Sequence, residues 1–232
     1  PAHMDSFKNI ENIIKTKEEI LSYQGYPKTV ILNLDDDNFN RWSLKANKNR
    51  IITISINKSA DYYISTLKNN TICVKTPYSD IIDLYVNDVE PHTLNNILFS
   101  IALAYEAGAR SSNVIKGLCN YNDVDGRFSI KKGHYGSRVI DSSYNANPHS
   151  FIASINSLVR LDHEPWLIMG EMGELGENSE LYHRQVARYA HDMGVKKLFV
   201  ISKHASAILD EFGPNSYKFD SIEALIIFIK PQ

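Results

Sequence analysis

The stretch Trp166-Leu-Ile-Met-Gly-Glu-Met-Gly-Glu-Leu-Gly176 places an apolar run directly before a glycine-rich turn. The apolar run has the length of a buried strand, and a helical pattern resumes over about 178–193. A further apolar run, Leu198–Ile201, follows that helix. Strand, helix and strand in this order predict a βαβ unit and a mostly parallel sheet.

The alternation of strands and helices continues on both sides of this unit. Apolar residues at helical spacing predict a helix over about 148–161 and a last helix over Ile222–Ile229. Upstream, Arg127–Ile130 and Arg138–Asp141 are predicted to pair as a hairpin. These elements together predict an α/β domain.

A domain boundary is predicted in Asn120–Gly126, where the periodicity is lost and turn-forming residues gather. We therefore expect two domains, residues 1–122 and 123–232. Before the boundary the pattern predicts helices over about 9–23, 93–108 and 112–121, a strand over 29–34, and a strand-rich stretch over 50–86 with a hairpin turn at Asn69–Asn70.

Composition and charge exclude several classes of protein. The 232 residues carry 25 Lys and Arg against 27 Asp and Glu, and this balance offers no basic surface to a nucleic acid. The two cysteines are too few for a disulfide framework, which fits a reducing cytosol. No apolar run is long enough to span a membrane. We expect a cytoplasmic protein with no nucleic-acid partner and no membrane insertion.

Lys17 is the most informative residue of the first part of the chain. Helical spacing from Ile10 and Ile20 places Lys17 within the apolar stripe of its helix, with Glu18 and Glu19 on the solvent side. Burial would lower the pKa of Lys17 towards a neutral amine, which can react with carbon dioxide to give a metal-binding carbamate. Alternatively, the side chain packs its stem and keeps its charge in water, which periodicity alone favours.

Two polar segments follow predicted strands in the second part. Gly170–Gly176 is interpreted either as a ligand cradle or as a structural turn between strand and helix. Asp141–Pro148 is dense in short polar groups at the carboxyl end of a strand, where ligands of α/β proteins bind. Its alternative role is capping, with Asn147 as N-cap and Pro148 as the first helical residue.

His92 and Asn96 lie one turn apart at the start of a predicted helix, opposite its apolar stripe. The sequence contains no His-Glu-x-x-His pattern and no nucleophile elbow, which argues against a zinc protease and a serine hydrolase.

These segments, in this order, resemble the Mur ligase family. The most specific, Ser143-Tyr-Asn-Ala-Asn-Pro148 and Met172-Gly-Glu-Leu-Gly176, resemble the MurF-type branch, which adds D-alanyl-D-alanine. The resemblance implies an α/β chain made of the rear part of a P-loop-type ATPase central domain and a Rossmann-like C-terminal ligase domain. The other matching segments are Pro1–Phe7, Lys15–Ile20, Asn33–Asp36, His92–Asn96 and Asp125–Arg127.

The resemblance also implies an activity, ATP-dependent amide bond formation through an acyl phosphate, with ATP and Mg²⁺ as cofactors. Its substrates would be UDP-N-acetylmuramoyl-tripeptide and D-alanyl-D-alanine, in cytoplasmic peptidoglycan precursor synthesis, and we expect a monomer. Carried over by position, His3 and Lys17 (as its carbamate) would bind the metal, and both would act in catalysis together with Arg127. The residues implied to bind the nucleotide are Asn33, His92, Asn96, Arg127 and Asp141. Those implied to bind the substrates are Tyr144, Asn145, Asn147 and Glu174.

The chain departs from the family pattern in several places. Thr93 and Glu171 replace the usual Asn and Asp, and the sequence contains neither the phosphate loop nor the UDP-sugar domain. It begins at Pro1 without an initiator Met, so we expect an internal fragment that does not ligate by itself. The alternatives are another amide ligase of the superfamily, such as a folylpolyglutamate or cyanophycin synthetase, and a non-catalytic nucleotide- or partner-binding module.

Overall fold

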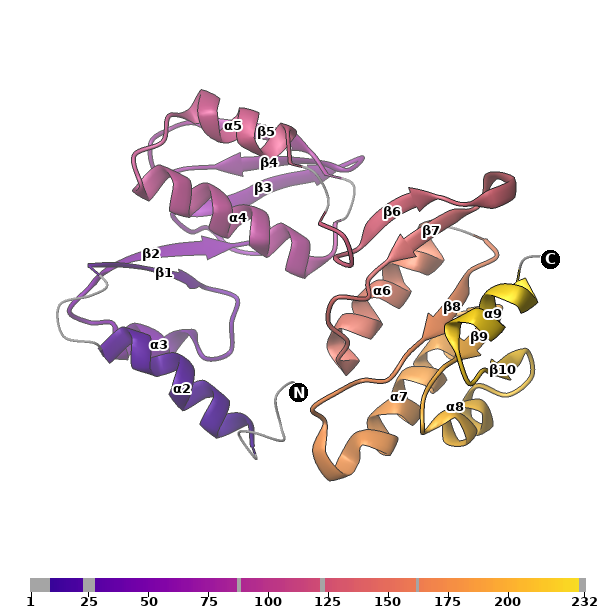
Figure 1. Ribbon diagram of the computed structural model, residues 1–232. Helices are drawn as coiled ribbons and strands as arrows, with labels where there is room; N and C mark the ends of the chain where they lie inside the picture. Colours follow the sequence, from indigo (N-terminus) through magenta and orange to yellow (C-terminus); the bar gives the residue numbers. More distant parts are fainter. Residues whose placement is uncertain (1–8, 23–27, 87–88, 122–123, 162, 230–232) are drawn as a thin grey trace. The chain divides into compact units, whose positions relative to one another are not determined.

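The computed structural model describes residues 9–22, 28–86, 89–121, 124–161 and 163–229. They form two compact units, one drawn from residues between Glu11 and Asn122 and the other mainly from residues between Asp123 and Gln232 (Figure 1). The two units are described separately below.

The first unit is built on a five-stranded mixed sheet. Its first three strands run parallel, and the last two continue the sheet as antiparallel neighbours. The turn between the third and fourth strands uses Asn69 and Asn70, both with positive φ, so the predicted hairpin turn is confirmed. The strands, in sheet order, are β1 Thr29–Asn33, β2 Arg50–Ser55, β3 Tyr62–Lys68, β4 Thr71–Lys75 and β5 Ile81–Tyr85.

The core of this unit lies between the sheet and helix α4, Pro91–Glu106, with α5, Ser111–Cys119, packed beside it. Leu98 and Ile101 of α4 are completely buried among the strand residues. Pro91 is well placed at the helix start because its missing N–H would have no partner there. Two further helices are α2, Ile10–Ser22, and α3, Phe39–Lys45. The sequence pattern did not predict α3.

The second unit begins with an antiparallel hairpin, β6 Ser129–Lys132 and β7 Arg138–Asp141, followed by α6, Pro148–Leu161. A parallel sheet of order β10-β9-β8 then alternates with helices, as expected. Strand β10, which has only three residues, was not predicted. The elements of this sheet and its helices are β8 Trp166–Met169, α7 Ser179–Asp192, β9 Lys197–Val200, α8 Ala205–Phe212, β10 Ser216–Lys218 and α9 Ile222–Ile229.

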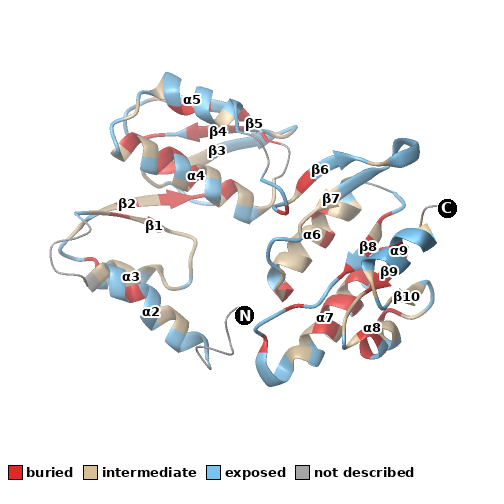
Figure 2. Ribbon diagram, viewed as in Figure 1, coloured by how far each residue is buried: buried red, intermediate tan, exposed pale blue. Residues whose placement is uncertain are grey.

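The core of the second unit forms where helices cover the parallel sheet. Ile155, Met169, Leu198 and Ile208 are completely buried there, and the buried residues of β9, α7 and α8 stand out in Figure 2. This packing leaves Gly170, Glu171, Gly173 and Glu174, in the turn after β8, exposed. In the described part of the chain, no helix combines the length and the apolar character that crossing a membrane requires.

Helix α4 offers a matched test of this packing. Leu98→Ala removes a completely buried side chain and should lower the free energy of unfolding by about 2–5 kcal/mol. Leu103→Ala, on the exposed side of the same helix, should change it by less than about 1 kcal/mol. Urea unfolding of both variants measures the difference, and equal losses would contradict this assignment of the core.

Candidate functional site

The end of β1 forms a rigid polar turn in the first unit. The Asp35 carboxylate accepts hydrogen bonds from Ser55 Oγ at 2.9 Å and from the Ile56 N–H at 2.8 Å. The Asp35 N–H in turn donates to Asn33 Oδ1 at 2.9 Å. Asp35 therefore ties the carboxyl ends of β1 and β2 together and orients Asn33.

Asn33 reaches the first turns of α4, because its Nδ2 donates to Asn95 Oδ1 at 3.3 Å. Helix α4 also carries His92 and Asn96, both exposed. The structure therefore brings Asn33 to the helix that carries these two predicted residues. Asn95, which makes the contact, was missed because its neighbour Asn96 matched the family pattern; its half-buried position is visible only in the fold.

Lys17 does not lie on a buried stripe, and that expectation is wrong. Lys17 is exposed, whereas Glu18, expected on the solvent side, is only 4% exposed. Two members of the expected stripe, Ile10 and Ile20, are also exposed. The expected stripe is kept in part, since Ile13, Ile14 and Leu21 are half-buried, but Glu18 replaces Lys17 on the inward face.

Arg41 of α3 is the partner of the buried Glu18. Its guanidinium pairs with Glu11 at 2.9 Å and also forms an ion pair with Glu18. A buried carboxylate needs such a partner, since leaving it unpaired is costly. The hydrogen bond from Arg41 lowers the pKa of Glu11, which is consistent with ion pairing along this face. His3, the other predicted metal ligand, lies outside the described residues.

In the second unit, Arg127 and Tyr144 come together. The Arg127 guanidinium carbon lies 4.3 Å from the centroid of the Tyr144 ring, and the Tyr144 N–H donates to the Gly126 carbonyl at 2.9 Å. Gly126 has a φ of +77°, and a Cβ there would lie 3.0 Å from the Tyr144 nitrogen. Only glycine allows this close approach, which places the arginine over the ring.

Asp141 is held at the end of the β6–β7 hairpin. It accepts hydrogen bonds from Ser143 Oγ at 2.6 Å and from the Ser143 N–H at 3.2 Å, and these bonds lower the pKa of Asp141. Lys131 Nζ lies 3.4 Å from the carboxylate and 2.9 Å from Asp125. Sequence reasoning missed Lys131, because its position diagonal to Asp141 follows only from the register Ser129↔Asp141.

Asn147 caps helix α6. Its Oδ1 accepts from the Ser150 N–H at 3.0 Å, and Ser150 Oγ accepts from the Asn147 N–H at 3.0 Å. Pro148 is the first helical residue, so the capping interpretation is confirmed. Tyr144 and Asn145, just before the cap, are exposed.

The turn after β8 carries Glu171 and Glu174. The Glu171 carboxylate accepts from Ser202 Oγ at 2.5 Å and lies 3.2 Å from Lys203 Nζ. Burial opposes ionisation of Glu171, but these bonds outweigh it and its pKa is lowered. Glu174, at a φ of +58°, occupies the left-handed region that few non-glycine residues adopt.

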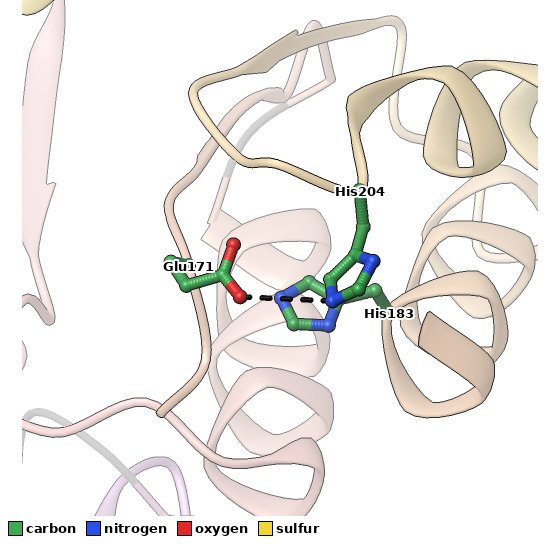
Figure 3. A group of neighbouring side chains, drawn as sticks. All are labelled: Glu171, His183 and His204. Atoms are coloured by element: carbon green, nitrogen blue, oxygen red, sulfur yellow. Dashed lines mark ion pairs between the residues drawn. The ribbon is translucent and has the colours of Figure 1, made fainter. Parts of the chain in front are cut away.

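His183 of α7 lies beneath this turn and was not predicted. It is completely buried and accepts the Met172 N–H. Together with Glu171 and His204 it forms a group of potential metal ligands whose atoms lie within 4.8 Å of one another (Figure 3). The only signal in the sequence was a histidine among the inward positions of α7, a pattern that does not distinguish it from an ordinary core residue.

Similarity to known proteins covers both units. Residues 1–104 match the model of the Mur ligase middle domain, and residues 126–230 match that of the Mur ligase glutamate ligase domain. Among curated relatives, the UDP-N-acetylmuramoyl-tripeptide–D-alanyl-D-alanine ligase of Escherichia coli is 28% identical over 99% of this chain and 51% of its own length. That of Haemophilus influenzae is 29% identical over 100% and 50%. The chain thus spans about half the length of these relatives.

Solved structures confirm the expected fold. MurF from Acinetobacter baumannii superposes with a TM-score of 0.82 at 23% identity, over 99% of this chain and 51% of its own. MurF from Thermotoga maritima in complex with ADP superposes with a TM-score of 0.81 at 20% identity, over 100% and 53%. Since the two domain models match nearly all of the sequence, the chain belongs to the Mur ligase family.

Proposed function

We propose that this chain is part of a MurF-type ligase, which joins D-alanyl-D-alanine to UDP-N-acetylmuramoyl-tripeptide at the expense of ATP. The observation that carries the proposal is the similarity of the whole chain to ligases of that name, on both units. The reaction would occur in the cytoplasm, where ATP and UDP-linked precursors are found, and we propose a monomer.

In the proposed reaction, a carboxylate oxygen of the tripeptide attacks the γ-phosphorus of ATP, and ADP leaves. The amine of D-alanyl-D-alanine then attacks the acyl carbon, loses a proton, and phosphate leaves. Arg127 would bind phosphate oxygens through its planar fork, which the Tyr144 ring helps to orient. Asp141, kept ionised by Ser143, would accept hydrogen bonds from ribose hydroxyls.

Asn33, His92 and Asn96 would contact the nucleotide from the first unit. The Asn33–Asn95 hydrogen bond supports this role because it holds the β1 turn against α4. Tyr144, Asn145 and Glu174 are exposed and would contact the peptide substrates. For Asn147, the Oδ1 atom is engaged in the helix cap, so any substrate contact would use its Nδ2 group.

Lys17 fits a magnesium site only as a carbamate, because an ammonium group has no lone pair and repels a cation. Because Lys17 is exposed, burial does not favour its neutral amine, and the carbamate is proposed from the position of Lys17 in the Lys15–Ile20 segment alone. With His3, it would hold Mg²⁺, which neutralises the crowded phosphate charge when bound. The chain's own contribution would be to orient Arg127, through Tyr144, and Asp141, through Ser143, for contact with the nucleotide.

The function is tested on the full-length protein. ADP release should require both UDP-N-acetylmuramoyl-tripeptide and D-alanyl-D-alanine, because the acyl phosphate forms on the first and is consumed by the second. A coupled assay for ADP measures this requirement. Turnover with a folate and glutamate instead would favour another amide ligase of the superfamily, and nucleotide binding without turnover would favour a non-catalytic module.

Lys17→Ala should lower kcat of the full-length enzyme by at least about 100-fold, since it would remove a ligand of the metal that offsets developing charge. Added bicarbonate or small carboxylates should restore part of the activity. Lys15→Ala, on the same helix and also exposed, is the matched control and should retain wild-type turnover. Wild-type kcat in Lys17→Ala would exclude the metal role.

A further inference from the structure

We propose that His183 is a positioning residue that holds the Gly170–Gly176 turn in its ligand-binding conformation through the backbone amide of Met172. The ligand-binding role of the turn rests on the proposed function, whereas the anchoring itself rests on the geometry below.

The hydrogen bonds of His183 determine its protonation. The backbone N–H of Met172 lies 3.0 Å from Nε2 and can only donate, so Nε2 carries a lone pair. The carbonyl of Ser179 lies 2.7 Å from Nδ1 and can only accept, so Nδ1 carries the proton. The ring is therefore neutral, in one tautomer, and both nitrogens are occupied within the chain.

The Met172 bond anchors the turn at its centre. The side chains of Met172 and Leu175 are buried in the core below the turn. On the other side, a Cβ built on Gly170 or Gly173 would meet no atom within 4 Å, so this side of the turn is open. Met172 and Leu175 are thus held below the turn, and Glu174 adopts its unusual φ on the exposed stretch between them.

His204 and Glu171 lie next to the His183 ring. His204 Nε2 lies 3.8 Å from Glu171 Oε1 and 3.1 Å from Ser179 Oγ, and the rings of His183 and His204 are 4.9 Å apart (Figure 3). A transition metal at His183 would need the lone pair that the Met172 N–H already occupies. This competition favours the anchoring role over a metal site.

Protonation would replace the accepting lone pair of Nε2 with a second N–H, facing the N–H of Met172. Burial lowers the pKa of His183 and opposes this change. Of the charges that face the ring, Glu171 opposes that shift, while His204 and Lys203 add to it. The anchor is therefore intact at neutral pH.

Two substitutions separate the two hydrogen bonds. The amide of Gln reaches the place of Nε2 and can accept the Met172 N–H, whereas the shorter Asn reaches the place of Nδ1 and can only replace the bond to Ser179. In the 232-residue chain, the Met172 amide should exchange with solvent about tenfold or more faster in His183→Asn than in His183→Gln. In the full-length enzyme, His183→Asn should raise KM for a peptide substrate about tenfold with kcat changed less than threefold, and His183→Gln should stay near wild type.

Equal exchange rates of the Met172 amide in His183→Asn and His183→Gln would overturn the anchor. Equal KM values of the two variants would overturn its effect on substrate binding. Nitrogen NMR of the wild-type chain tests the anchor even if His183→Asn does not fold, because Nε2 should be unprotonated and coupled to the Met172 amide. Zn²⁺ binding that perturbs the His183 resonances would instead favour a metal site. A full-length protein without ligase activity would refute the proposed function but leave the exchange result to decide the anchor.

The anchor also predicts a pH dependence of stability. The pKa of His183 is lowered from its ordinary value of 6.5, so the unfolded chain binds this proton more tightly than the folded one. The stability that neutral His183 contributes is complete above about pH 6.5 and is lost as the pH falls through the lowered pKa. Between about pH 7.5 and 5, Tm should fall more steeply for wild type than for His183→Gln. Parallel curves would contradict this linkage.

Discussion

The structure depends on one constraint: parallel strands buried under helices must all end at the same edge of their sheet. The covered faces of these strands are apolar, so the carboxyl ends of the parallel strands are where the chain gathers polar groups at one edge. In the first unit this edge carries Asn33 and Asp35, and in the second it carries the turn after β8. In each unit, helices cover the sheet, and these candidate functional residues therefore lie where its parallel strands end.

Hydrogen bonds and ion pairs hold buried polar groups that the apolar spacing does not account for, on α2 and beneath the turn after β8. On α2 the apolar spacing places Lys17 inward, but the structure buries Glu18, which pairs with Arg41, and leaves Lys17 exposed. Beneath the turn after β8, His183 satisfies a backbone amide that the core would otherwise leave without a partner. In both places a buried polar group has a partner within the chain, because leaving such a group unpaired is costly.

The sequence predicted correctly the features that depend only on neighbouring residues, such as helix caps and tight turns. Asn147 and Pro148 mark the start of α6, and Asn69–Asn70 marks a hairpin, because capping and positive φ involve only neighbouring residues. Helix α3 and strand β10 were missed because seven and three residues are too short to show a period. The candidate site residues were selected by their resemblance to family motifs. Contacts between them, such as Arg127 over the Tyr144 ring, could not be predicted from their spacing in the sequence.

The sequence by itself determined the class of fold, the order of its longer elements and the family, because apolar periodicity and short polar motifs are properties of neighbouring residues. Only the tertiary structure decided that Lys17 is exposed, that Lys131 joins Asp141, and that His183 accepts the Met172 amide. These outcomes depend on contacts between residues that are distant in the sequence, and such contacts form only when separate elements pack together.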